Sequence, residues 1–407
     1  MSQAPSESLP VSDVKRFTRR RVAIVLFGIL LFAVLVLVRF NVRGRFGGLF
    51  LLEGRGWRLL EVRDDLYLGE AHRLIAGVDF GPLRRRLYAK LYSGNTRPTL
   101  ELSWDEADGK GYVISDFGDG RRLVTNFSRF AEEDGKVERG LFVGGGLPEA
   151  VMDDNLAKLT ETGMAYFNGR RWLHIWCSSN EAISAGGATA ALSTPSDWRF
   201  LGSEIIQNGP RRVVLSSSHE VVLEGVPLRI DRFAYFRVGE PYFRLGIRIR
   251  NEGDRTVSVD YQYGDEPWLG DFGSSAGNVG WTKAGIVERV GQIDTVSNRY
   301  AGMFDCGNSL VGPRHDFTNA ANFIEWLGGN VPSFAYFGND SRYDEADTAS
   351  GAPLASNTRF LGLQWGPAIL EPGEETTIYL AVGMASVDAK TGRPVKPDVP
   401  LLSPLDE

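Results

Sequence analysis

The chain has 407 residues, of which 43% are hydrophobic and 24% are charged. This length allows one large globular domain or two ordinary ones. Eight of the 45 basic residues and two of the 51 acidic residues lie in residues 1–45, so residues 46–407 carry 37 basic and 49 acidic residues, a net charge of −12. Such an acidic domain excludes a nucleic-acid partner, which would need a basic surface, and disfavours contact with an anionic membrane surface.

The first predicted element is a transmembrane helix over residues 22–40. The segment Val22–Val38 contains neither a charged residue nor a proline, and a helix needs about 20 apolar residues to cross the bilayer core. The long side chain of Arg39 can reach the interface, so Phe40 extends the apolar stretch. A cleaved signal peptide is the alternative, but no small-residue cleavage site follows in residues 39–43. The segment is therefore interpreted as an uncleaved signal anchor.

The charges that flank this segment predict its orientation. Five basic residues precede it and three follow it, and cytoplasmic flanks carry the larger number of basic residues. Residues 1–21 are therefore expected to be a cytoplasmic tail and residues 41–56 a linker. The sequence thus predicts a single-pass membrane protein whose main domain is periplasmic or extracellular.

Strand patterns dominate residues 57–387. The segment Tyr242–Arg250 alternates strictly, with Arg244, Arg248 and Arg250 on the face opposite to its apolar residues, as in a half-buried antiparallel strand. Further strands are predicted at Arg85–Tyr92, Thr99–Trp104, Tyr112–Asp116, Arg122–Phe127, Val137–Val143, Met164–Phe167, Trp172–Trp176, Val257–Tyr263, Phe323–Leu327, Ser333–Phe337, Arg359–Trp365 and Thr376–Met384. One soluble helix is predicted at Pro148–Thr160.

These strands, which lack the spacing of alternating strand–helix units, predict a large antiparallel β-sandwich. A division of the domain into two subdomains near residues 195–210 is an alternative. Residues 388–407 are rich in proline and are expected to form a loose tail.

The run Arg229–Trp268 carries a resemblance to a known class of domains. It comprises a long strand, Gly239-Glu240-Pro241, a second long strand that ends in Arg-Asn-Glu-Gly-Asp, and an aromatic strand. This order, with the turn Leu370–Glu374 before the last strand, resembles the β-supersandwich domains of galactose-mutarotase-like enzymes, glycoside phosphorylases and polysaccharide lyases. The resemblance implies a supersandwich fold and a carbohydrate ligand, and it supports the fold more than any activity.

The segment Tyr263–Gly273 is the strongest candidate for a ligand site. It combines carboxylates, aromatic residues and glycines, and Pro267 prevents it from continuing a strand. Sugars stack on aromatic rings and form hydrogen bonds to carboxylates and amides. The predicted ligand-binding residues are Asp265, Trp268, Asp271, Asn278 and Trp281.

Two alternatives stay open for this segment. Asp265, Glu266 and Asp271 offer hard oxygen ligands, which Ca²⁺ prefers. The segment can also be a structural loop that inserts Trp268 into the core. No cofactor or other metal is predicted, since the spacing of a zinc site is absent.

His174, His315 and Glu266 are the candidate catalytic residues. The resemblance implies a histidine acid with a carboxylate base, because mutarotase-like enzymes use that pair, and both groups can be tuned near neutral pH. Glu181 is a possible partner of His174, and His219 is expected in a turn. A structural role is the alternative for each histidine.

The two cysteines, Cys177 and Cys306, are expected either to form one disulfide or to remain buried thiols. Together these patterns predict a membrane-anchored domain that binds or modifies a cell-envelope carbohydrate. The alternative is a non-catalytic envelope assembly or scaffold protein that uses the sandwich for contacts with other proteins.

Overall fold

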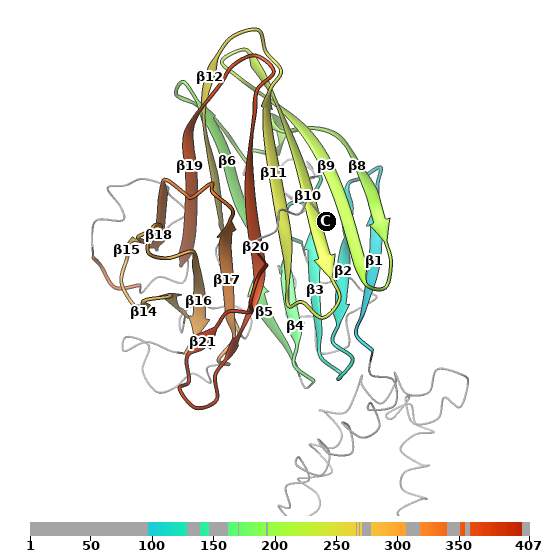
Figure 1. Cartoon of the computed structure of the whole chain (residues 1–407), viewed down its shortest axis with the longest axis vertical. Helices are drawn as coiled ribbons and strands as arrows, with labels where there is room; N and C mark the ends of the chain where they lie inside the picture. The colour runs from blue at the N-terminus through green and yellow to red at the C-terminus, as the bar shows by residue number, and fades with distance from the viewer. Residues whose placement is uncertain are drawn as a thin grey trace, which may run out of the picture. The chain divides into compact units, whose positions relative to one another are not determined.

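The computed structural model describes part of the chain, namely residues 97–127, 139–145, 162–169, 171–192, 194–265, 267, 269–270, 278–306, 318–339, 351–354 and 359–400. The chain divides into two compact units, residues 1–91 and 92–407, and every described residue belongs to the second. Antiparallel strands make up most of the described residues, which confirms the predicted mainly β class (Figure 1).

Several predicted elements lie outside the described residues. They are the membrane span at 22–40, the flanking tail and linker, the strand at Arg85–Tyr92 and the helix at Pro148–Thr160. Within the described ranges, no helix has the length and hydrophobicity needed to cross a membrane.

The strands form three sheets. The five-stranded sheet has the order β1 (Thr99–Asp105), β2 (Lys110–Asp116), β3 (Arg122–Phe127), β4 (Met164–Phe167) and β5 (Trp172–Trp176). The six-stranded sheet has the order β15 (Gly291–Gln292), β18 (Phe334–Gly338), β19 (Phe360–Leu370), β12 (Val257–Asp265), β6 (Ser179–Ala185) and β7 (Ala188–Ala191).

The ten-stranded sheet is the largest. Its order is β14 (Gly285–Val287), β13 (Asn278–Thr282), β16 (Tyr300–Asp305), β17 (Ala321–Leu327), β20 (Glu375–Val387), β11 (Tyr242–Asn251), β10 (Val226–Arg237), β9 (Arg212–Leu223) and β8 (Arg199–Asn208), and β21 (Pro394–Val395) pairs with β20. A short 3-10 helix, η2 (Pro195–Asp197), precedes β8. In Figure 1 the red β20 lies beside the yellow-green strands β11, β10 and β9, although their positions in the sequence are far apart.

One hydrophobic core joins the three sheets. The ring of Phe127 on β3 contacts Phe236 on β10 and Phe243 on β11 edge to face, with ring centroids 6.1 and 5.6 Å apart. On β11, Phe243, Leu245 and Ile247 all point into this core and are buried. The predicted alternation of this strand is therefore confirmed, and both smaller sheets pack on one face of the ten-stranded sheet.

The opposite face of the ten-stranded sheet is called the outer face below. It carries Asp231 and Tyr235 on β10 and Arg244 and Arg248 on β11, which point away from the core because side chains alternate along a strand. The register between these two strands runs without interruption from Leu228 to Tyr235 on β10, so the alternation is the same on both.

The C-terminal segment covers one end of the outer face, where Trp281, Phe323 and Tyr242 belong to a second hydrophobic cluster. Val399 is buried in this cluster, and Lys396 forms a 2.7 Å ion pair with Glu325 on β17. The prediction of a loose tail is therefore wrong for residues 388–400. These residues fold onto the sheet because the cluster would otherwise expose apolar side chains to water.

Three smaller predictions are also wrong. The proposed division near residues 195–210 is absent, since β8 crosses these positions and pairs with β9 throughout. Residues 139–145 form no strand beyond one bridge from Phe127 to Val143, because Gly140 adopts a φ of +101°, which an extended strand does not allow. His219 lies within β9 and is buried, so it is not in a turn.

A buried ion pair connects the ten-stranded sheet to the six-stranded sheet. The guanidinium of Arg232 on β10 donates two hydrogen bonds to the carboxylate of Glu181 on β6, one of them 3.2 Å long. The Tyr261 hydroxyl on β12 donates to the same carboxylate, and the guanidinium lies 4.1 Å from the ring centroid of Phe142. Glu181 therefore pairs with Arg232 and not, as predicted, with His174.

All the polar members of this ion-pair group are shielded from water. Arg232, Glu181 and Tyr261 are at most 1% exposed. Burial alone would lower the pKa of Arg232, but the charge of Glu181 and the hydrogen bonds to its carboxylate raise it overall. The guanidinium therefore stays charged in the core.

Removing one partner of this pair should destabilise the protein strongly. Arg232→Met leaves the Glu181 carboxylate buried without its counter-charge, and the expected loss is about 3–5 kcal/mol of unfolding free energy, measured by urea denaturation of the full chain. Glu181→Met should cost a similar amount. The double variant should recover much of the loss, because it buries no unpaired charge. Additive losses in the double variant would refute this account.

Candidate functional site

The predicted segment Tyr263–Gly273 starts within β12, which ends at Asp265, and the part after this strand is called the predicted loop below. Of its candidate residues, Glu266, Trp268 and Asp271 lie outside the described residues, as does His315, and for Asp265 only the backbone is described. Their binding and catalytic roles, and the Ca²⁺ alternative, remain predictions. Among the described residues, no group of three metal-ligating side chains occurs.

His174 on β5 lies beside this loop. Its backbone forms a pair of hydrogen bonds with Gly270, of 2.9 and 3.1 Å, so the loop adds a bridge to the edge of the five-stranded sheet. Its imidazole is fully buried, and Nδ1 lies 2.5 Å from Oγ1 of Thr162. The structure thus brings His174 to the predicted loop but places its side chain out of reach of solvent.

Strict alternation along β5 would place His174 on one face with Trp172 and Trp176, but the register keeps this pattern for Trp172 and breaks it for Trp176. The register between β4 and β5 shifts between Met164 and Ala165. Because such a bulge reverses the alternation beyond it, Trp172 and Trp176 belong to different hydrophobic clusters.

Asn278 fixes the other end of the loop. Its Oδ1 accepts a 2.9 Å hydrogen bond from the backbone N–H of Leu269, and its Nδ2 donates to Asp305 at 3.1 Å. The other carboxylate oxygen of Asp305 accepts hydrogen bonds from Thr318, and the guanidinium of Arg359 donates to the Asn278 carbonyl. Burial lowers the pKa of Arg359 to about 10.

Trp281 on β13 is also a core residue. It is 2% exposed, and its indole N–H donates to the carbonyls of Met303 and Asn322 at 3.2 and 3.0 Å. Neither face of its ring is open to a sugar. His174 and Asn278 thus hold Gly270 and Leu269 of the predicted loop, whereas Trp281 binds carbonyls of β16 and β17, and all three side chains lie in the core.

Cys177 and Cys306 do not form a disulfide with each other, and both are half-buried. Of the two outcomes expected for Cys177 and Cys306, the structure therefore shows the one without a disulfide. Burial raises the pKa of Cys306 to about 11, so this thiol is a poor nucleophile near neutral pH.

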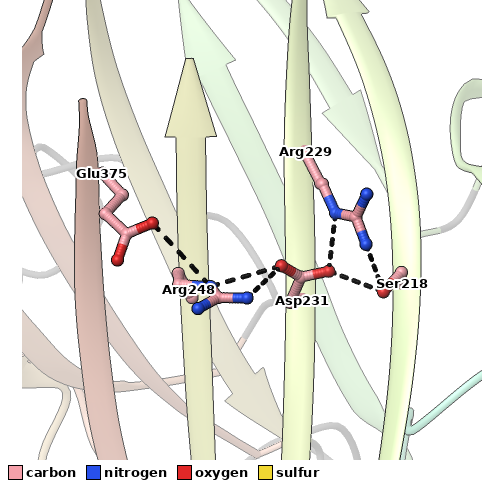
Figure 2. A network of polar contacts seen from close by, with 5 residues as sticks. All are labelled: Ser218, Arg229, Asp231, Arg248 and Glu375. Atoms are coloured by element: carbon pink, nitrogen blue, oxygen red, sulfur yellow. Dashed lines mark hydrogen bonds and ion pairs between the residues drawn. The ribbon is translucent and has the colours of Figure 1, made fainter. Parts of the chain in front are cut away.

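The outer face carries a second group of polar side chains, called the polar row below. Figure 2 shows its five members side by side on four neighbouring strands: Ser218, Arg229, Asp231, Arg248 and Glu375. The strand register accounts for this arrangement, since Asp231 lies directly opposite Ser218 on β9 and opposite Arg248 on β11.

Asp231 is the centre of the polar row. Its Oδ1 accepts hydrogen bonds from the Ser218 hydroxyl at 2.5 Å and from Nε of Arg229 at 2.9 Å. Its Oδ2 accepts two hydrogen bonds from the guanidinium of Arg248, at 2.7 and 3.2 Å. Arg248 also forms a 3.9 Å ion pair with Glu375. One carboxylate thus orients two guanidinium groups.

The polar row combines a buried acid with accessible cations. Burial by itself would raise the pKa of Asp231, but the hydrogen bonds from Ser218, Arg248 and Arg229 lower it overall. The side chains of Arg229 and Arg248 are 41% and 34% exposed. The guanidinium of Arg248 lies 5.6 Å from the ring centroid of Phe233. The row therefore presents fixed hydrogen-bond donors beside an aromatic ring, as sites for polar ligands do.

The polar row was not predicted as a site from the sequence, although some of the side chains on this face were identified there. The alternation of Tyr242–Arg250 already placed Arg244, Arg248 and Arg250 on one face. Asp231 was not recognised, because its contact with Arg248 depends on the pairing of β10 with β11.

Comparisons with known proteins give only distant likenesses. No family model and no curated protein matches the chain. Among solved structures, a galactose mutarotase-like protein from Clostridium acetobutylicum aligns with a TM-score of 0.33 and 8% identity over 71% of this chain and 99% of its own. An α-galactosidase of family GH36 from Geobacillus stearothermophilus aligns with a TM-score of 0.33 and 9% identity, over 72% of this chain and 41% of its own.

A TPR-domain containing protein from Parabacteroides distasonis aligns equally well, with a TM-score of 0.34 and 9% identity over 73% of this chain and 50% of its own. The neighbours thus include the mutarotase-like class that the strand pattern resembles. Likenesses of this size assign neither an activity nor a ligand to this chain.

The two buried histidines should make stability depend on pH. Burial lowers the pKa of His174 to about 4 and that of His219 to about 3, from 6.5. At a pH between 6.5 and the lowered pKa of each histidine, the unfolded chain binds a proton that the folded chain does not. The free energy of unfolding therefore falls as the pH drops below 6.5, and it levels off below the pKa of the folded state. For His174 the loss from pH 6.5 to 5 is about 1.5 kcal/mol.

Urea denaturation of the full chain and of His174→Gln across this pH range tests the expectation. The variant should show a shallower decline, and His219→Gln should do the same independently. Declines that match the unsubstituted chain in both variants would contradict the assignment.

Proposed function

We propose that the chain is a membrane-anchored protein whose β-sandwich binds a carbohydrate of the cell envelope on the outer face of the ten-stranded sheet. The polar row carries this proposal. Sugar hydroxyls need donors and acceptors in fixed directions, together with an aromatic or apolar surface for their C–H groups. Asp231 supplies the fixed geometry, Arg229 and Arg248 supply exposed donors, and Phe233 lies beside them.

Binding is favoured over catalysis by the state of the histidines that the structure describes. His174 and His219 are at most 1% exposed, and their lowered pKa values keep both rings neutral at physiological pH. A general acid must reach the proton that it transfers, and neither ring reaches the solvent.

The proposed binding can be tested by screening the full chain against a panel of neutral and acidic envelope glycans. Asp231→Asn should weaken binding about tenfold or more, because the two arginines lose the charge that orients them. The matched control is Asp119→Asn, which removes a carboxylate from an exposed 2.6 Å ion pair with Arg121 outside the ten-stranded sheet.

Thermal unfolding of each variant separates lost binding from lost folding. If Asp231→Asn unfolds, the partly exposed Arg248→Gln replaces it in the same assay. Binding that is unaffected by the variants of the polar row, or reduced equally by the control, would overturn the proposal and favour a scaffold protein that contacts other proteins.

The membrane anchor is part of the same proposal and rests on the uncharged segment Val22–Val38. A helix of this hydrophobicity partitions into the bilayer essentially irreversibly. The full chain should therefore stay in the membrane pellet after washing with alkaline carbonate and enter the soluble fraction only with detergent. Release by carbonate alone would contradict the anchor.

A further inference from the structure

A cavity lined by arginines opens at one end of the sandwich, where β9 begins and β10 ends. Its volume is about 1170 Å³. This cavity is called the arginine cavity below. The described residues that line it include no carboxylate and five arginines, namely Arg97, Arg211, Arg212, Arg237 and Arg244. Tyr235 contributes an aromatic ring to the same lining.

Strand pairing gathers these cations. Arg212 on β9 lies directly opposite Arg237 on β10, and Tyr235 lies opposite Arg244 on β11. The turn before β9 is held by a 2.9 Å hydrogen bond from the N–H of Val238 to the carbonyl of Arg211. A 3.0 Å hydrogen bond from Leu100 to Pro210 brings the start of β1, and with it Arg97, to the same turn.

The charge in this cavity contrasts with the rest of the domain. Residues 46–407 carry a net charge of −12, yet the lining concentrates positive charge. Within the described residues, no ion pair involves Arg97, Arg211 or Arg237, and Arg244 forms a 3.8 Å ion pair with Glu240. Like charges directly opposite on paired strands destabilise a sheet, and a bound anion would remove that cost.

We propose that the arginine cavity binds the anionic groups of an acidic polysaccharide. Guanidinium groups bind carboxylate, sulfate and phosphate oxygens in pairs of parallel hydrogen bonds, and Arg211 and Arg237 are exposed in the cavity. The identity of the ligand as a polysaccharide rests on the proposed function, whereas the affinity for an anion follows from the cavity alone.

The position of the cavity favours a chain-like ligand. Tyr235 and Asp231 lie on the same face of β10, four residues apart, which corresponds to about 13 Å along the strand. A polysaccharide can therefore reach the cavity and the polar row together. An anionic membrane surface is a poorer fit than a single polymer chain. A flat surface brings its charge against the whole acidic domain, whereas one chain contacts only the cavity and the strands beside it.

The test compares two double variants that remove the same charge. Arg211→Gln/Arg237→Gln removes two exposed cations from the cavity, and Arg121→Gln/Arg289→Gln removes two exposed cations from elsewhere on the domain. Isothermal titration of the full chain uses polygalacturonate, dextran sulfate and inorganic phosphate as anionic probes, with neutral dextran as the reference. Thermal unfolding confirms that both double variants fold.

The cavity variant should bind at least one of the polyanions about tenfold or more weakly than the unsubstituted chain, while the control changes little. Polygalacturonate identifies a carboxylate ligand, dextran sulfate a sulfate ligand, and phosphate shows whether a single anion suffices. Equal effects of the two double variants, or no binding of any anionic probe, would overturn the inference.

Two further results separate this inference from the proposed function. A neutral glycan that depends on Asp231, together with no binding of any anionic probe, would refute the arginine cavity and leave the polar row. A polyanion that depends on the arginines but not on Asp231 would support the cavity and refute the polar row. Binding only to phosphatidylglycerol vesicles, dependent on the same arginines, would replace the polysaccharide with a lipid headgroup and overturn the inference.

Discussion

The buried pair of Arg232 and Glu181 determines which side of β10 faces the core. A charged guanidinium can enter an apolar interior only where a carboxylate meets it, and Glu181 is available on β6 of the opposing sheet. Side chains alternate along a strand, so with Arg232 inside, Asp231 and Phe233 must point outward. A slip of one residue would bury Asp231 and expose Arg232, and it would lose both the core pair and the polar row.

The outer face thus depends on the same registers that close the core. Asp231 meets Arg248 because β10 pairs with β11, and Tyr235 meets Arg244 four residues further along the same pair of strands. The positive charge of the arginine cavity is opposite in sign to the net charge of residues 46–407. The acidic surface around the cavity repels anions, whereas the cavity itself attracts them. An anionic ligand is therefore directed to the cavity and away from the rest of the domain.

Much of the local structure could be predicted from the sequence. The bounds of β3, β4 and β5 agree with the predicted ranges, because each is a short apolar run between clear breaks. The alternation of β11 correctly separated its core side from its arginine side. The segment predicted as a ligand site starts at Tyr263, but β12 continues through Asp265, so its first three residues belong to the strand.

What could not be predicted depends on contacts between distant segments. Glu181 and Arg232 are 51 positions apart, and no local pattern indicates that they meet. The surroundings of His174 include Thr162 and the backbone of Gly270, and no local pattern indicates these contacts. Trp281 and Asn278 were chosen for their chemistry, which suits a sugar site and a core hydrogen-bond network equally well.

The segment that ends in Val399 has a practical consequence for handling the protein. It covers Tyr242 and Phe323, and its Lys396 neutralises Glu325, a carboxylate whose pKa burial raises. A recombinant boundary or a proteolytic cut near residue 388 would remove this cover and leave an apolar patch beside the Glu325 carboxylate, which would have lost its counter-charge. Such a fragment would tend to self-associate, and its aggregation could be mistaken for a native oligomer.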